Sequence, residues 1–265
     1  MKPLTVIISH TFVCKLAPVF LLVSTALSAP EILRNVNNNN FTTQQNDENF
    51  NSTKHIPSLN ISHLNWQILD KLSFEDGVAL ENYKAPYDIP KRYMYYLGGY
   101  NHENLPIWII KGSEWDIVEG VRKAQTAELE IYFMQMAQRF IKSIPARSTP
   151  DNPVTKAVFL VDFADLQYRQ VIHLPTVTFA TGMLSAAAHL IEKYVGGAYV
   201  VNANFATRIL VNIVRPFLEG IFSKVFVYGN DKAIWMPEIL KVFPKNSIPA
   251  WYGGEKGYKP VEVYG

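Results

Sequence analysis

The segment AYVVNANFATRILVNIVRPFLEGIFSKVFVYG, residues 198–229, predicts one strand–helix–strand unit. Its flanks, residues 196–204 and 224–229, are short apolar runs that are typical of buried strands. Between them, the pattern over 208–223 predicts a helix whose polar side chains form one narrow stripe. Such a helix is mostly buried or contacts something oily that is not protein. Pro216 predicts a kink in it, because proline lacks the amide proton that a helical hydrogen bond needs.

Strands and helices alternate in the same way through the chain from residue 63 onward. Because the predicted strands are apolar throughout, we expect them to be buried on both faces. This pattern predicts the α/β class, with a largely parallel or mixed sheet covered by helices. Residues 84–100, which contain two prolines, are interpreted as a linker. The other predicted elements are strands at 105–112 and 156–163 and helices at 63–72, 115–144, 173–194 and 235–244.

The composition excludes several classes of protein. With 265 residues, 48% of them hydrophobic, the chain can bury the core of one domain. A net charge of +2 gives no electrostatic argument for nucleic-acid binding. Since Cys14 is the only cysteine, an intramolecular disulfide and a cysteine-rich zinc site are both impossible.

Motifs for catalysis or cofactor binding are absent from the sequence. It contains no nucleophile elbow, zinc-protease motif, phosphate-binding loop or dinucleotide-binding motif, and the six histidines show no ligand spacing. Asp162 and Asp165 have the residue type of an acid–base pair, but a turn at the end of a strand is the favoured interpretation. We therefore expect no catalytic residue, no metal ligand and no cofactor.

Residues 1–28 resemble a secretory signal peptide. The uncharged apolar run at 16–27 is shorter than the ~18 residues of a membrane span. Ala26 and Ser28 are small residues that fit a cleavage site before Ala29. The alternatives are a signal anchor and an irregular N-terminus that targets nothing. We expect a secreted or lumenal protein, and a cytoplasmic one if this segment is not a functional signal.

Residues 29–62 are polar and rich in asparagine, so they cannot bury a core and are expected to be disordered. They contain three N-glycosylation sequons, at Asn40, Asn51 and Asn60. Three sequons agree with secretion, and the protein is expected to be a glycoprotein.

Four motifs later in the chain carry a resemblance to a known family. YLGGYNHENLPIWIIKGSEWD (96–116) is similar to that family's approach to its first strand, and VFLVDFADL (158–166) is similar to its central strand. The segment 198–229 resembles a strand, an Asn-Ala-Pro turn, a gating helix and a further strand, and ILKVFPKNSIPAWYGGE (239–255) resembles a closing Gly-Gly signature. On these motifs, residues 64–255 resemble the CRAL-TRIO lipid-binding domain family, especially its tocopherol-associated and phosphatidylinositol-transfer members.

The resemblance implies a domain layout and a mechanism. Residues 63–90 would be the remnant of an N-terminal helical module, 91–255 the lipid-binding domain and 256–265 a C-terminal tail. The helix at 208–223 would be a lid that covers a hydrophobic cavity and contacts a bilayer when open. Lys224 matches the position at which phosphoinositide-binding members hold a lysine near the headgroup phosphate. The alternative is a strand-end lysine in water.

Other positions depart from the pattern of the family. Lys193 and Tyr194 stand where a Glu-Arg pair precedes the third strand, and Asn204 replaces the proline of the turn. Gln167 and Arg169 stand where some members hold small hydroxyl residues for phosphocholine. The ligand therefore stays open among phospholipids, phosphoinositides and tocopherol- or retinoid-like molecules.

The predicted ligand-binding residues are those expected around the cavity, and the alternative is that they are plain core. Because side chains alternate between the two faces of a strand, we expect about half of them to line the cavity. The candidates are Trp108, Ile110, Phe159, Val161, Phe163, Phe179, Met183, Tyr199, Val201, Ile213, Phe217, Lys224 and Phe226.

These observations predict a carrier of one hydrophobic molecule, without enzymatic activity. Binding would rest on burial of apolar ligand surface, at ~25 cal/mol per Å². Its partners would be the ligand and, transiently, a membrane surface that the lid helix contacts; we expect a monomer and no nucleic acid. Two alternatives remain: an interaction module that docks on membranes or proteins without transfer, and a lipid hydrolase.

Overall fold

The computed structural model describes residues 61–265. The predicted signal peptide, almost all of the asparagine-rich segment and the three predicted glycosylation sites lie outside the described residues.

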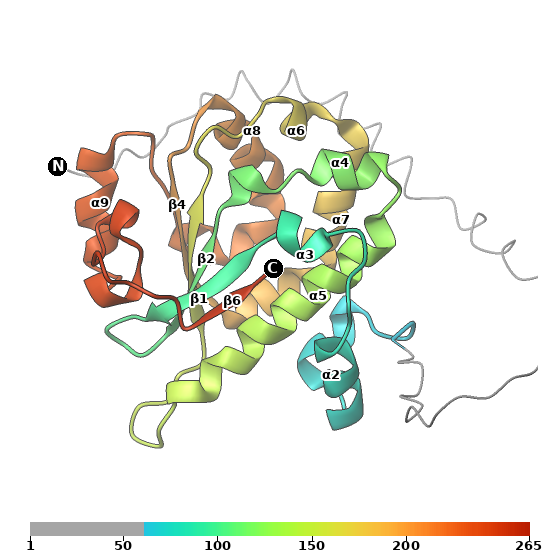
Figure 1. Ribbon diagram of the computed structural model, residues 1–265, viewed down its shortest axis with the longest axis horizontal. Helices are drawn as coiled ribbons and strands as arrows, with labels where there is room; N and C mark the ends of the chain where they lie inside the picture. Colours follow the sequence, from blue (N-terminus) through green and yellow to red (C-terminus); the bar gives the residue numbers. More distant parts are fainter. Residues whose placement is uncertain (1–60) are drawn as a thin grey trace, which may run out of the picture. The chain divides into compact units, whose positions relative to one another are not determined.

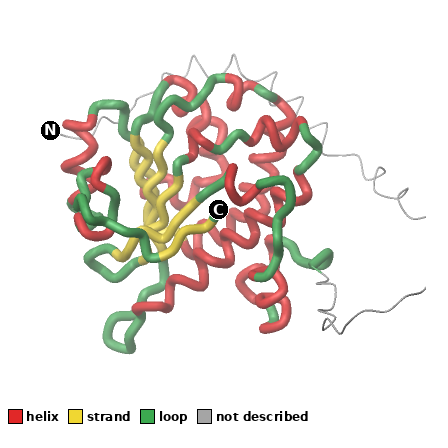
Figure 2. Tube along the Cα trace, in the orientation of Figure 1, coloured by secondary structure: helices red, strands yellow, loops and turns green. Residues whose placement is uncertain are grey.

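The described residues contain one six-stranded sheet, in the order β5-β4-β3-β2-β1-β6. Strands β2 to β5 are parallel to one another, whereas β1 is antiparallel to β2 and β6 is antiparallel to β1. Figure 2 shows the strands as one continuous layer with helices around it. The predicted α/β class with a mixed sheet is confirmed. The strands are β1 Tyr95–Tyr100, β2 Pro106–Ile110, β3 Ala157–Asp162, β4 Val195–Val201, β5 Val225–Val227 and β6 Glu262–Tyr264.

Helices connect the parallel strands and cover both faces of the sheet (Figure 1). The α-helices are α2 Phe74–Glu81, α3 Ile89–Arg92, α4 Ile117–Arg122, α5 Thr126–Ser143, α6 Arg169–Ile172, α7 Leu174–Tyr194, α8 Phe205–Val214 and α9 Lys232–Leu240. The 3-10 helices are η2 Trp66–Lys71, η3 Gly112–Glu114, η4 Ile144–Arg147, η5 Arg215–Lys224, η6 Lys245–Ser247 and η7 Ala250–Tyr252.

The two faces of the sheet carry separate cores because alternate residues of a strand point in opposite directions. Trp108 and Phe159 belong to the core on the face that α5 and α7 cover. Ile107 and Leu160 belong to the core on the other face, together with Trp235 of α9. Figure 1 shows α5 and α7 on one side of the strands and α9 on the other.

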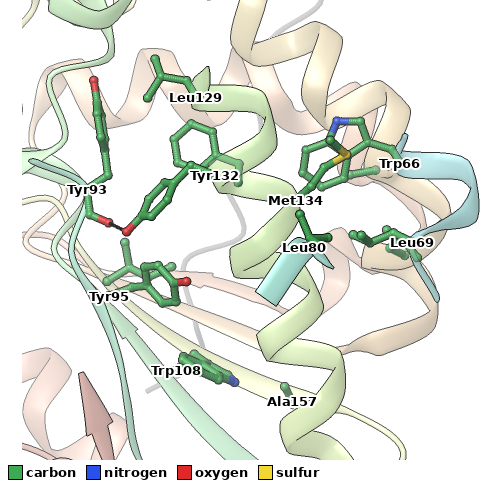
Figure 3. Close-up of a cluster of buried hydrophobic side chains, with 14 of the residues drawn as sticks. Trp66, Leu69, Leu80, Tyr93, Tyr95, Trp108, Leu129, Tyr132, Met134 and Ala157 are labelled. Carbon is green, nitrogen blue, oxygen red and sulfur yellow. Dashed lines mark hydrogen bonds between the residues drawn. The ribbon is translucent and has the colours of Figure 1, made fainter. Parts of the chain in front are cut away.

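Aromatic side chains dominate the core beneath α5 (Figure 3). Tyr95 and Trp108 lie with ring centroids 5.9 Å apart. The Tyr132 hydroxyl donates a hydrogen bond to the backbone oxygen of Tyr93 at 3.0 Å, so this buried polar group is satisfied. Large, fully buried rings of this kind hold α5 firmly on the sheet.

The prediction that residues 84–100 form a linker is wrong. Pro90 stands in the first turn of α3, where a proline is tolerated because that amide has no helical acceptor. Residues Tyr95–Tyr100 then form β1, which pairs with β2 across an irregularity between Leu97 and Gly99. The two prolines and two glycines of this segment favoured a linker in the sequence analysis, although the segment contains an ordered helix and a strand.

The single helix predicted at 115–144 is two helices, α4 and α5. Ala124 between them has a φ of 54°, and the Gln125 amide donates back to the Gly120 carbonyl, so the chain turns there. The left-handed conformation costs an alanine roughly 1–2 kcal/mol, so alanine is an unusual residue for such a turn. The helical periodicity of the sequence therefore does not reveal the turn. The helix predicted at 63–72 is the 3-10 helix η2.

The other strand predictions hold to within a few residues, and the kink predicted at Pro216 coincides with a change of helix type. There the α-helix α8 passes into the 3-10 helix η5, with Pro216 in the first turn of η5. The last ten residues, 256–265, contain β6, which pairs with β1 and completes the sheet.

Helix α7 is the only helix of the described residues that is long and apolar enough to cross a membrane, judged by length and composition alone. It spans 21 residues with a mean hydropathy of 1.3. It also packs through Ala187 and Leu190 into the core on the α5 side. Only 17% of its apolar window is buried, and length and composition alone are weak evidence for a membrane span.

Candidate functional site

A cavity of about 230 Å³ lies at the carboxyl ends of β2 and β3, beneath α8. This is the end of a parallel sheet at which α/β proteins usually bind their ligands. Strands, loops, α6, α7 and α8 all contribute to the wall. The wall residues are Ile110, Gly112, Trp115, Ile117, Val161, Phe163, Leu166, Gln170, Val171, Thr176, Val177, Ala180, Thr181, Leu210, Ile213 and Val214.

The turn after β3 is held by Asp162. One of its carboxylate oxygens accepts from the Ala164 amide at 2.9 Å and the Asn202 side-chain amide at 2.8 Å, and the other accepts from the Tyr252 hydroxyl at 2.8 Å. Asp165 has a φ of 61°, as in a tight turn. These contacts agree with the turn interpretation of Asp162 and Asp165. The turn leads from β3 to the cavity wall.

Helix α8 is fixed at its N-terminus by a capping box between Asn204 and Thr207. Ala206 of α8 then packs with Val171 of α6 and with Leu166, which precedes α6, in a small buried cluster. Further along α8, Leu210, Ile213 and Val214 close the cavity.

Four of the predicted ligand-binding residues meet in this wall: Ile110, Val161, Phe163 and Ile213. Four more lie on the same side of the sheet but in or against the aromatic core: Trp108, Phe159, Phe179 and Met183. The Trp108 ring lies 4.5 Å from that of Phe140, and its indole nitrogen donates to the Ser143 hydroxyl at 3.0 Å. Phe217 is half-buried on η5, outside the wall.

Tyr199, Val201 and Phe226 lie on the opposite face of the sheet. Tyr199 is level with Leu160 in the register of β3 and β4, and Leu160 belongs to the core under α9. The Tyr199 and Phe226 rings stack with centroids 4.9 Å apart on that face. Alternation along β4 and β5 turns these three side chains away from the cavity.

The Lys224 side chain is exposed and forms no hydrogen bond or ion pair among the described residues. It precedes Val225, which is level with Ala198 and therefore with Phe159. Lys224 thus stands at the amino-terminal end of the parallel strands, whereas the cavity opens at their carboxyl ends.

Lys193 and Tyr194, which stand in place of the family's Glu-Arg pair, both hydrogen-bond to Asp70. The Lys193 ammonium donates to the Asp70 carboxylate at 2.8 Å, and the Tyr194 hydroxyl donates to the same oxygen at 3.3 Å. The Asp70 side chain is only 3% exposed, and the hydrogen bond from Lys193 holds its pKa below the usual range. This pair ties η2 to the end of α7.

Sequence reasoning missed the part of the wall that α6 and α7 supply. Thr176, Val177, Ala180 and Thr181 follow a spacing of i, i+1, i+4 and i+5, so they share one face of α7. Small side chains along that face were the available signal, because they leave room where larger ones would fill the space.

The wall contains no charged side chain, and its polar groups are Gln170, Thr176 and Thr181 in addition to the Trp115 indole. That indole donates to the Met94 carbonyl at 3.0 Å, and Thr181 donates to the Val177 carbonyl at 2.8 Å. The arrangement can enclose an apolar molecule and offer it a few neutral hydrogen-bonding groups.

Thr176 and His173 form the nearest approach to a nucleophile and a base, with a hydrogen bond of 2.8 Å between the hydroxyl and Nδ1. No carboxylate of the described residues hydrogen-bonds to His173, so no third group orients the ring. His173 is the N-cap of α7 and Thr176 lies in its first turn. A contact at the start of a helix accounts for the pair.

Exposed apolar side chains surround this end of the sheet. Tyr168, Ile172, Leu174 and Phe205 are between 52% and 72% exposed and come from α6, the start of α7 and the start of α8. The Tyr168 and Phe205 rings stack with centroids 6.2 Å apart, and Figure 1 shows α6 and α8 at the same end of the sheet. We call these four residues the apolar patch.

The fold is a mixed sheet with helices on both faces, and the cavity beneath α8 is lined mainly by apolar side chains. The sequence profile described as the CRAL/TRIO domain matches residues 90–254, so the chain belongs to that family and the predicted resemblance is confirmed. Members of this family generally bind and transfer lipids or other hydrophobic ligands and are generally not enzymes.

Solved structures agree on the fold. The chain is similar to Sfh5, with a TM-score of 0.50 and 10% sequence identity, over 71% of this chain and 66% of Sfh5. At that identity the likeness concerns the fold alone. No curated protein sequence matches the chain.

Proposed function

We propose that this protein binds a single hydrophobic ligand in the cavity beneath α8 and carries it between membranes without enzymatic chemistry. The observation that carries the proposal is the wall itself, which is apolar apart from a few neutral polar groups. Burying a ligand there removes apolar surface from water, at about 25 cal/mol per Å².

We propose that α8 and η5 together act as the lid. The cavity, at about 230 Å³, is smaller than the roughly 300–1,000 Å³ of most ligand pockets, so a larger ligand requires the lid to move. The change from α-helix to 3-10 helix at Arg215 and Pro216 supplies a weak point. Phe217 and Leu218 beyond it are only half-buried, whereas Ile221 near the end of η5 is buried and anchors that end.

The apolar patch supports a proposed transient contact with a membrane surface. Its four side chains stand around elements that form the cavity wall, so a ligand leaving the cavity would pass directly into lipid. Exposed apolar groups of this kind, gathered at one end of a molecule, are typical of interaction surfaces.

Secretion and glycosylation at Asn40, Asn51 and Asn60 remain part of the proposal, supported by the signal-like N-terminus and the sequons. We propose a monomer, located in the secretory pathway or outside the cell. If residues 1–28 do not act as a signal, the cytoplasm is the alternative.

The test is native mass spectrometry of the full chain purified from a eukaryotic secretory host, followed by organic extraction. We expect one co-purifying hydrophobic molecule at near-stoichiometric amount. A chain that is empty, and that extracts nothing from liposomes of mixed lipid composition, would contradict the carrier function.

The small cavity also favours a second candidate, an interaction module that docks on membranes without transfer. In that case the same empty chain would still sediment with liposomes through the apolar patch. Extraction and sedimentation measured on one preparation therefore separate the two candidates.

A further inference from the structure

We propose that the cavity selects neutral ligands that carry an oxygen acceptor, such as an ester, ketone or alcohol group, over lipids with a charged headgroup. This inference rests on the proposed function and specifies its ligand class. It starts from the absence of any charged side chain in the wall.

The cations directly next to wall residues in the sequence have other partners, and Lys111 pairs with Glu114. Arg208, two residues before Leu210, is exposed and does not line this cavity. Arg169, next to Gln170, forms an ion pair with Asp116, and Arg215, next to Val214, lies 4.5 Å from the Phe222 ring centroid. A carboxylate or phosphate brought into the cavity would therefore lose its water and find no counter-charge there. Burying an unpaired charge is strongly unfavourable.

Gln170 supplies a free hydrogen-bond donor. Its side-chain oxygen accepts from the Ile117 amide at 3.3 Å, and only the oxygen can play that role because the partner is an N–H group. The amide nitrogen of Gln170 therefore keeps both of its N–H groups without a partner among the described residues, in a side chain that lines the cavity.

The two threonines of the wall already have hydrogen-bond partners. Thr181 donates its hydroxyl proton to the Val177 carbonyl, and Thr176 is hydrogen-bonded to His173. Gln170 is thus the polar side chain of the wall that has no partner for its donor group among the described residues, and a ligand oxygen can accept from it. An unpaired donor in an apolar cavity favours an acceptor over a plain hydrocarbon.

The first experiment titrates the full chain with three ligands of equal chain length by isothermal calorimetry: methyl decanoate, decan-1-ol and decanoate. We expect the ester and the alcohol to bind at least about tenfold more tightly than decanoate at pH 7.5, because only decanoate is charged there. Equal or tighter binding of decanoate would overturn the inference but leave the carrier function intact. Failure of all three to bind would overturn both.

The second experiment changes the donor and keeps the local structure. Gln170→Glu retains an oxygen for the Ile117 amide but replaces the free amide nitrogen by a second carboxylate oxygen. Methyl decanoate, which only accepts hydrogen bonds, should bind roughly three- to tenfold more weakly. Decylammonium should bind more tightly than it does to the unchanged protein.

Gln67→Glu is the matched control, because Gln67 is exposed and donates to the Ala186 carbonyl, away from the cavity wall. This variant should bind methyl decanoate and decylammonium like the unchanged protein. Unaltered binding of methyl decanoate by Gln170→Glu, with its fold verified by circular dichroism, would overturn the assignment of Gln170 as the donor.

Discussion

At the scale of single residues, the pair formed by Asp70 and Lys193 shows how one contact changes the meaning of a sequence position. Lys193 stands where relatives with a phosphoinositide site place part of a Glu-Arg pair. Here it neutralises a carboxylate that is only 3% exposed. A lysine committed to Asp70 is a structural residue, which agrees with the departure of this position from the family's pattern.

We predict that Lys193→Met lowers the melting temperature by roughly 2–4 °C at pH 7, since it leaves the buried Asp70 carboxylate without its cation. The pKa of Asp70 is depressed in the folded state, so its contribution to stability is present above its unfolded value and is lost as the pH falls through the folded value. The difference between variant and parent should therefore shrink below about pH 4.

Thermal unfolding followed by circular dichroism at several pH values checks this prediction. Lys84→Met is the control, because Lys84 is exposed and forms no ion pair among the described residues. A difference that stays constant down to pH 3 would contradict the role given to Asp70.

At the scale of elements, β6 shows that a segment interpreted from sequence as a C-terminal tail can be part of the folded sheet. It has three residues and adds the last strand to the edge of the sheet beside β1. Its Tyr264 ring stacks on Tyr95 with centroids 5.2 Å apart, and the Arg139 guanidinium lies 4.2 Å from the Tyr264 centroid. Burial raises the pKa of the Tyr264 hydroxyl.

We predict that Tyr264→Ala lowers the free energy of unfolding by about 1–2 kcal/mol, because it removes the stacked ring and the cation above it. Urea denaturation of the purified chain measures this. Tyr87→Ala is the matched control, since Tyr87 is 61% exposed and lies outside the sheet. Equal stability of the two variants would show that β6 contributes nothing to the folded domain.

The face of α7 toward the cavity gives a prediction about ligand size. Ala180→Phe places a ring in a space of about 230 Å³, so binding of any co-purified ligand should fall at least about tenfold while the fold persists. Ser185→Phe, at an exposed position of the same helix, should bind like the parent. Native mass spectrometry reads both, and undiminished ligand occupancy in Ala180→Phe would place the ligand elsewhere.

At the scale of the whole molecule, the apolar patch and the cavity stand at the same end of the sheet. The topology accounts for this, because parallel strands deliver all of their carboxyl ends, and the loops and helices that follow them, to one edge. A membrane-facing surface and a ligand cavity can therefore be built from the same connections.

We predict that Phe205→Ser weakens sedimentation with liposomes roughly tenfold or more, because the exposed ring no longer enters the lipid. Phe74→Ser is the matched control, since Phe74 is 87% exposed on α2. Equal loss in both variants would mean that membrane contact is not confined to the apolar patch.

Local pattern determined a large part of this molecule. Apolar runs located β2, β3, β4 and β5, helical spacing located α5, α7 and α8, and Pro216 marked the break before η5. These features depend on which residues are neighbours in sequence, so they are legible without a structure. The motifs in strands and turns likewise identified the family from the sequence.

Tertiary structure decided what depends on residues far apart in sequence. The register of β3 with β4 placed Tyr199 away from the cavity, and the pairing of β1 with β2 and β6 made strands of segments read as a linker and a tail. The approach of α6 to the end of β3 brought Gln170 into the wall. The spacing of apolar residues along the chain indicates which side chains are buried. Only long-range packing determines which partner buries each of them.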